Sequence, residues 1–451
     1  MGSPVSLSQL ICIAGIALLV CLVAPFAGWP TAFISGYLLT LGGVTTTLFI
    51  LGDVNIHYGI APGSPTFWLS DFLLALALLA IWASGGPWSG GWLLLIFAVL
   101  SSILLLRVWG NTPEQWSGLK LYMTAIVSFG IGRWLGQHLT SNAGLVLAWT
   151  SLVVCGIQFV TTGAQALGVL LVRPGTTNAT LWINQGRMVG LYDHPSFLGK
   201  TVLLQLCFLL PLTASGRALT RRLATTAIVL GTVATVLTLA RANIVAIGVA
   251  IVLWTILSNR ATTVAVRLAI GGLVGGVLVA MNAGPIGALA ARQLEDPYGG
   301  RRGSLLDIGL GQIKSALTTG TGPNYYSEVV GQYDPMAAKG FPVHNSFLYP
   351  IAELGLPIGL LFFSPLIVTV VWTALRAIRE GRIDVKSAAL LSLLPGIAVV
   401  AWTGWGMISW EILPLWFAGF GFLSADGDTI SFSKHQADTA TAPEQPARSA
   451  A

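Results

Sequence analysis

The segment from Arg301 to His344 contains side chains that can bind phosphate and transfer protons. Arg301 and Arg302 precede GSLLDIGLGQIKSAL (303–317), where leucine and isoleucine recur at three- and four-residue steps, as in an amphipathic helix. Two guanidiniums beside a helix N-terminus suit a phosphate or diphosphate, because arginine offers forked donors and the helix end adds unpaired N–H groups. The alternative is an arginine pair that is solvated or bound to lipid headgroups.

His344 and Asn345 stand directly before a hydrophobic segment, in HNSFLYPIAELGLPIG (344–359). A histidine at such a boundary can act as a general base near neutral pH, or it can be an interfacial side chain that is hydrogen-bonded to the backbone. Glu353 lies inside the hydrophobic segment, where a carboxylate is costly unless it is paired or lines a wet cavity.

Arg241 interrupts a long apolar stretch in LTLARANIVAIG (237–248). A guanidinium buried there needs an anionic partner, which either the protein or a ligand can supply. A second histidine occurs in GRMVGLYDHPSFLGK (186–200). Arg187, Asp193 and His194 in this segment either help to shape a site or belong to an ordinary turn that the aspartate caps.

The composition requires lipid as the solvent for most of the chain. Of 451 residues, 54% are hydrophobic and 9% are charged, whereas soluble domains have about 25% charged residues. We therefore expect an all-α, polytopic integral membrane protein with about 12–14 transmembrane helices, and membrane lipids as partners. The predicted spans are 10–27, 31–51, 67–83, 92–109, 119–136, 144–165, 196–214, 223–240, 242–258, 264–281, 348–375, 387–405 and 410–424.

The spans divide the chain into four predicted regions. Residues 1–281 and 346–424 are transmembrane helices, 282–345 form one large extracytoplasmic loop, and 425–451 form a disordered cytoplasmic tail. Basic residues set this orientation, because loops rich in lysine and arginine stay in the cytoplasm. They are Arg217, Arg221, Arg222, Arg260, Arg267, Arg376, Arg379, Arg382 and Lys386.

Several kinds of chemistry are not expected. The net charge of +6 is spread over short loops, without the basic stripe that binds a nucleic-acid backbone. No cluster of histidine, cysteine and carboxylate has the spacing of metal ligands. We therefore predict a metal-independent site, no cofactor and no nucleic-acid partner.

The motifs together resemble the O-antigen ligase and polymerase superfamily of bacterial membrane glycosyltransferases. HNSFLYPIAELGLPIG is similar to the family's His-Asn, aromatic-Leu and Glu-x-Gly stretch, and LTLARAN is similar to its Leu-Thr-x-Ser-Arg-Gly, with alanines replacing the Ser and Gly. GLYDHPSFLGK resembles a Gly-x-x-x-x-Pro-Asn-x-Leu-Gly segment with Ser196 at the Asn position. The arginine of the family's large periplasmic loop corresponds to Arg301 or Arg302, of which Arg302 is preferred.

The resemblance implies a helical bundle like that of GT-C glycosyltransferases, in the bacterial inner membrane, with its active site on the extracytoplasmic face. It implies transfer of a glycan from polyprenyl (undecaprenyl) diphosphate to a hydroxyl of a lipid or glycan acceptor, with inversion. Arg241 and Arg302 would hold the diphosphate and His344 would be the base. Asn345 would orient the imidazole or a sugar, and Glu353 would pair with an arginine or fix the histidine tautomer.

Three alternatives to a ligase are distinguishable by experiment. A polymerase of the same superfamily would extend the glycan on its own carrier. A lipid-linked oligosaccharide flippase or another transporter should show inverted repeats and ionisable residues near the bilayer midplane, neither of which is apparent here. A noncatalytic envelope scaffold would form no glycosidic bond.

Overall fold

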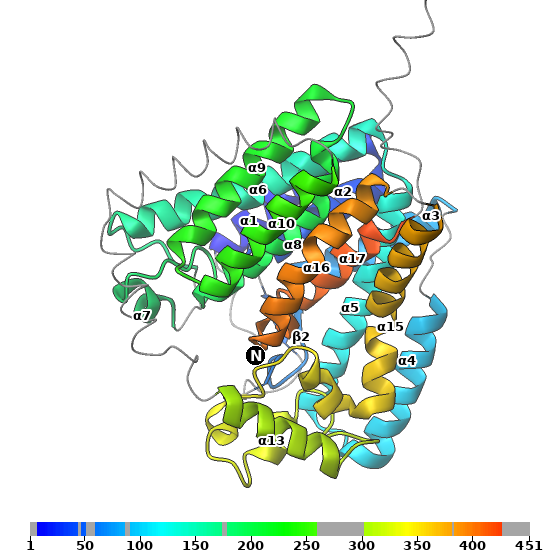
Figure 1. The fold of residues 1–451 in the computed structure, drawn as a ribbon, viewed down its shortest axis with the longest axis vertical. Helices are drawn as coiled ribbons and strands as arrows, with labels where there is room; N and C mark the ends of the chain where they lie inside the picture. The colour runs from blue at the N-terminus through cyan, green and yellow to red at the C-terminus, as the bar shows by residue number, and fades with distance from the viewer. Residues whose placement is uncertain are drawn as a thin grey trace, which may run out of the picture.

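A computed structural model describes residues 7–43, 47–50, 59–85, 91–173, 178–258, 302–380 and 383–425. Most of these residues are helical (Figure 1). The elements are α1 Leu7–Ala27, α2 Trp29–Leu41, β1 Thr47–Ile50, β2 Thr66–Trp68, α3 Leu69–Ala83, α4 Gly91–Leu104, η1 Leu105–Trp109, α5 Pro113–Gln137, α6 Ser141–Ala166, α7 Ala179–Asn184, α8 Pro195–Thr213, α9 Ala218–Leu237, α10 Arg241–Leu257, α13 Arg302–Ser315, α14 Tyr326–Val330, η2 Ala337–Lys339, α15 Leu348–Glu380, α16 Val385–Trp402, η3 Gly406–Ile408 and α17 Leu413–Leu423.

The helices confirm an all-α membrane protein. Six of those in the described ranges are long and apolar enough to cross a membrane, and three shorter helices are also apolar. Each predicted span in these ranges overlaps a helix, whereas the span 264–281 and the tail 426–451 lie outside the described residues.

The predicted span 31–51 was too long. Helix α2 ends at Leu41, and Thr47–Ile50 form a strand that pairs antiparallel with Thr66–Trp68. Apolar β-branched and aromatic residues such as Phe49 and Ile50 suit a short strand as well as a helix, so hydropathy alone does not find this boundary.

Small residues let the central helices approach closely. A Cβ added at Gly132 or Gly421 would strike the backbone of the facing helix, Ala418 in α17 or Phe129 in α5. In the same way, Gly396 in α16 faces the backbone of Ala246 in α10. This is the packing that membrane helices use when apolar burial alone provides little driving force.

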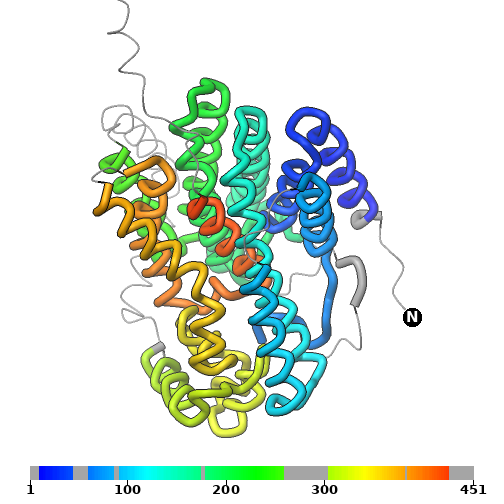
Figure 2. Tube along the Cα trace, turned by 90° about the vertical axis from the view of Figure 1, so that its right-hand side faces the viewer, coloured from blue at the N-terminus to red at the C-terminus, as the bar shows by residue number. Residues whose placement is uncertain are grey.

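One end of the bundle carries a polar cap, defined here as residues 302–347. It contains the predicted amphipathic helix, which is observed as α13, and then α14 and η2. Both views show α13 and the chain that follows it at the same end of the bundle (Figures 1 and 2). The basic residues Arg217 and Arg379, near the start of α9 and the end of α15, mark the opposite, basic end.

Candidate functional site

His344 lies in the last turn of the cap, immediately before α15. Its ring is half-buried, and Nδ1 lies 2.9 Å from the backbone oxygen of Pro342. Because a carbonyl oxygen only accepts hydrogen bonds, Nδ1 carries the proton of the neutral ring. This tautomer leaves the lone pair on Nε2, as a general base requires.

The residues after His344 attach it to two helices. The Asn345 side-chain oxygen accepts hydrogen bonds from the amides of Phe347 and Leu348, at 2.9 and 3.0 Å, and so caps the start of α15. The Ser346 amide donates to Ala401, and its hydroxyl donates to Gly404, at the end of α16. Asn345 therefore positions the backbone beside His344, and its expected contact with the imidazole or a sugar stays a prediction.

Glu353 is fully buried, and its partners differ from the expected arginine or histidine. Its carboxylate accepts hydrogen bonds from the Tyr122 hydroxyl and the Asn324 amide, both at 2.8 Å. The Tyr326 amide donates a longer bond of 3.4 Å. The carboxylate is thus satisfied by neutral donors and joins α5, the cap and α15.

The backbone geometry at Gly355 explains why a glycine stands two residues after Glu353. The φ of Gly355 is +74°, and an added Cβ would strike the backbone of Thr318. Gly320, with φ +65°, meets the backbone of Glu353 from the other side. Two glycines at left-handed φ therefore allow the cap and α15 to touch backbone to backbone.

Arg241 occupies a sharp break between two helices. Helix α9 ends at Leu237, Leu239 has φ +54°, and Arg241 is the first residue of α10. A left-handed leucine is unusual and costs energy, so the surrounding structure holds this turn in place. The half-buried Arg241 side chain therefore starts from a rigid, non-helical junction.

Arg187 lies against the same break. Its buried guanidinium donates from Nε to the Thr238 carbonyl at 3.4 Å and lies 4.7 Å from the centre of the Trp182 ring. The next amide, of Met188, donates to the Leu237 carbonyl. The structure thus brings two of the predicted arginine positions, separated in sequence, to one turn.

The starts of α8 and α10 are joined through polar side chains. The His194 Nδ1 accepts from the Ser196 amide at 3.0 Å and caps α8, and Asn243 donates to the Ser196 carbonyl at 2.9 Å. Lys200, which is also buried, donates to the Ser196 hydroxyl at 2.5 Å. Two helix N-termini and a buried cation therefore lie together next to the Arg241 turn.

Asp193 was expected either to help shape a site or to cap an ordinary turn, and the structure shows it bound to an earlier segment of the chain. Its carboxylate accepts hydrogen bonds from the backbone amide and the side chain of Asn178, at 2.7 and 3.1 Å. It therefore holds the segment before α7, while the neighbouring histidine caps α8.

A series of contacts runs from the residues after His344 to the start of α10, the helix that Arg241 begins. Ser346 binds the end of α16 at Ala401 and Gly404. The following Trp405 packs edge-on against Phe197 at 6.1 Å, and Gly406 faces the end of Lys200. Since Lys200 and Asn243 share Ser196, the contacts extend from the cap to the start of α10.

Residues 226–364 match the family model described as O-Antigen ligase. This match, over about a third of the chain, supports the resemblance to the O-antigen ligase and polymerase superfamily. No curated protein matches the chain at a significant level. The matched segment contains Arg241, His344 and Glu353, whereas the segment with Arg187 and His194 lies before it.

The arginine of the large predicted loop was assigned to Arg302 or Arg301. Arg302 is the first residue of α13, whereas Arg301 lies outside the described residues. Their assignment to the diphosphate remains a prediction. Within the described ranges, no three histidine, cysteine, aspartate or glutamate side chains come together as metal ligands.

Sequence analysis missed an ion pair near this site. Arg173 binds Glu411 at 2.6 Å and lies 5.9 Å from the centre of the Trp410 ring. Burial raises the pKa of Glu411, and nearby Asp193 raises it further, while Arg173 acts in the opposite direction. The two partners are 238 residues apart, so no local motif signals the pair.

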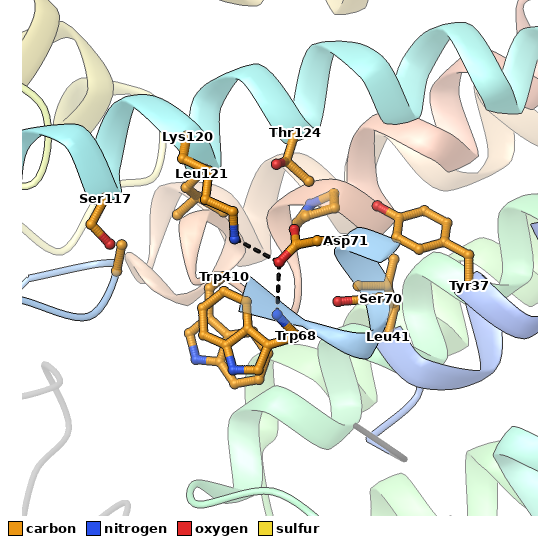
Figure 3. A pocket seen from close by; sticks show the side chains of 12 residues that line it. Tyr37, Leu41, Trp68, Ser70, Asp71, Ser117, Lys120, Leu121, Thr124 and Trp410 are labelled. Carbon is orange, nitrogen blue, oxygen red and sulfur yellow. Dashed lines mark hydrogen bonds and ion pairs between the residues drawn. The ribbon is translucent and has the colours of Figure 1, made fainter. Parts of the chain in front are cut away.

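A second missed cluster surrounds the short β-hairpin. Lys120 donates to Asp71 at 2.6 Å and lies 4.6 Å from the centre of the Trp68 ring, which stacks on Trp410 at 4.2 Å (Figure 3). The cavity beside these residues is about 20 Å³, room for about one water. A sugar ring does not fit into this cavity. The cluster therefore has a structural role.

Proposed function

We propose that this protein is a glycosyltransferase of the O-antigen ligase type, which transfers a glycan from a polyprenyl diphosphate carrier, such as undecaprenyl diphosphate, to an acceptor hydroxyl. The reaction is inverting and metal-independent, on the extracytoplasmic face of a bacterial inner membrane. The observation that carries the proposal is the contact path from His344 through Ser346, α16 and Lys200 to the Arg241 turn. It joins a base to cations across segments far apart in sequence.

The cations suit a departing diphosphate. Arg241 begins α10, and the first turn of that helix contacts the start of α8 where Lys200 also binds, so the proposed site has an arginine, an ammonium and helix-end amides in neighbouring turns. Arg302, with Arg301 as the alternative, would add a donor from the cap. Arg187 is a positioning residue, because its Nε already binds the Thr238 carbonyl that precedes Arg241.

The proposed step is a single displacement. The acceptor oxygen attacks the anomeric carbon, the bond from that carbon to the diphosphate oxygen breaks, and the electron pair leaves with the diphosphate. His344 takes the acceptor proton on Nε2, while the arginines stabilise the negative charge on the leaving group. Inversion follows because no glycosyl-enzyme forms.

A ligase is proposed over a polymerase, with a lipid or glycan acceptor. The test incubates the purified chain in detergent with a polyprenyl diphosphate glycan and either a lipid acceptor or a second carrier-linked glycan. Products are identified by mass spectrometry. A ligase forms the lipid conjugate, and a polymerase forms a doubled glycan on the carrier. A transporter or scaffold forms neither, and that outcome would reject the proposed function.

A further inference from the structure

A groove at the basic end of the bundle lies on the membrane-facing side, far from the cap. It has a volume of about 380 Å³, within the size range of small-molecule sites. Helices α4, α5 and α15 form its walls, and Ser424 closes one side. Its lining residues are Leu93, Ile126, Phe129, Arg133, Ser364, Pro365, Val368, Thr369, Trp372 and Ser424.

Most of this lining is apolar, and part of it faces outward. Val368 is 62% exposed and Trp372 is 57% exposed, on the same side of α15. In a membrane protein such side chains meet lipid tails rather than water. The groove is therefore open to the bilayer, and its occupant must enter from there.

Arg133 is the cation of this groove. Its Nε is buried, and among the described residues it has no hydrogen-bond partner. A buried guanidinium donor without an acceptor is costly in an apolar setting, so the site is incomplete without an anionic oxygen. The hydroxyls of Ser364, Thr369 and Ser424 also line the groove and can accompany such a group.

The position of Arg133 fits a lipid headgroup. It lies near the end of α5, where Lys386 donates to the carbonyls of Gly136 and Ala425. Arg379 follows Trp372 along α15 toward the same end. A headgroup at Arg133 would leave its acyl chain to run along Val368 and Pro365, toward the middle of the membrane.

We propose that this groove binds an anionic glycerophospholipid, with its phosphate on Arg133 and an acyl chain against α15. This inference is independent of the proposed transferase site. The basic end is where the positive-inside rule places the cytoplasmic leaflet, which carries anionic lipids. A phosphate accepts hydrogen bonds from a guanidinium, and the headgroup charge completes the site.

Native mass spectrometry of the delipidated full chain in detergent tests the proposal, with phosphatidylglycerol and phosphatidylcholine as probes. The wild type should bind phosphatidylglycerol preferentially, and Arg133→Gln should weaken that binding about tenfold, as expected for loss of a charged hydrogen bond. Arg379→Gln removes the same charge at the same end but outside the groove, and should keep the preference. Equal binding of both lipids by the wild type, or an unchanged preference in Arg133→Gln, would overturn the proposal.

A second pair of variants tests the acyl chain's place. Val368→Trp fills the groove, whereas Val371→Trp adds the same bulk on α15 at a position that does not line it. Phosphatidylglycerol binding should fall in the first variant and persist in the second. Equal effects in both would also overturn the proposal, and circular dichroism confirms that each variant remains helical.

Discussion

His344 and Glu353 belong to the same sequence motif but act differently. The imidazole is half-buried with Nδ1 directed at a backbone oxygen, so its other nitrogen can take a proton. The carboxylate is fully buried and accepts from Tyr122 and two backbone amides. The motif thus combines one residue suited to chemistry with another that fixes the helix behind it.

The roles of some individual residues were predictable from the sequence. An asparagine directly before an apolar helix is a common N-cap, and this signal could have identified the role of Asn345. The partners of Glu353 could not be predicted, because Tyr122 is 231 residues away and the two backbone amides leave no mark in the sequence. Long-range pairs of this kind need the fold.

The buried Glu411 carboxyl should make stability depend on pH. Its pKa is raised above the ordinary 4.5 chiefly by burial, so the folded chain holds this proton more tightly than the unfolded chain. The stabilisation is complete below about pH 4.5 and is lost as pH rises through the raised pKa. Glu411→Gln should therefore reduce the decline in thermal stability as the pH rises above about 4.5.

Thermal unfolding in detergent measures this change. Glu380→Gln serves as the control, because Glu380 is an exposed carboxylate paired with Arg376 at the basic end. A Glu411→Gln protein that keeps the full wild-type decline with pH would show that another group is responsible.

At the scale of elements, apolar runs predicted the helices well because lipid imposes a length and composition on each span. They missed the strand pair β1–β2 because a four-residue apolar strand resembles the end of a helix. In the sequence, the only sign of the break at Leu239 was the charged Arg241 within an apolar stretch. Its left-handed geometry depends on the packing of α9, α10 and Arg187.

The contact between the cap and α15 makes a prediction about glycines. Gly355→Ala introduces a Cβ at φ +74° that strikes the Thr318 backbone, so it should destabilise the protein by more than about 1 kcal/mol and reduce transfer. Gly311→Ala is the matched change, because Gly311 lies inside α13 with no atom within 4 Å. It should stabilise α13 by about 1 kcal/mol.

Thermal unfolding and transfer assays on both variants distinguish the loss of this backbone contact from a general sensitivity of the protein to replacing glycine by alanine. If Gly355→Ala is as stable and as active as Gly311→Ala, the cap does not depend on this contact.

At the scale of the molecule, the two ends of the bundle differ in chemistry. The cap end carries His344, the Arg241 turn and the buried Arg173–Glu411 pair, whereas arginines gather at the basic end. The sequence predicted this division from charge alone. It could not predict which cap residues touch which helices, because contacts such as that of Ser346 with Gly404 join residues 58 positions apart and leave no local motif.

The tail should be dispensable for the chemistry. Residues 426–451 are rich in alanine, serine and threonine and have few large apolar residues to bury. A chain that ends after Ala425 should insert into the membrane and transfer glycan at the wild-type rate, measured per mole of purified protein. A large loss of activity with unchanged insertion would give the tail a functional role.

The central claim is that His344 is the base of a glycan transfer, and two histidines allow a matched test. His138, which ends α5 at the basic end, has its Nδ1 3.0 Å from a backbone oxygen, much as His344 does. In the reconstituted transfer assay, His344→Ala should lower the rate by about a hundredfold or more while the protein remains folded. His138→Ala should transfer at nearly the wild-type rate. Transfer by folded His344→Ala at the rate of His138→Ala would contradict the account.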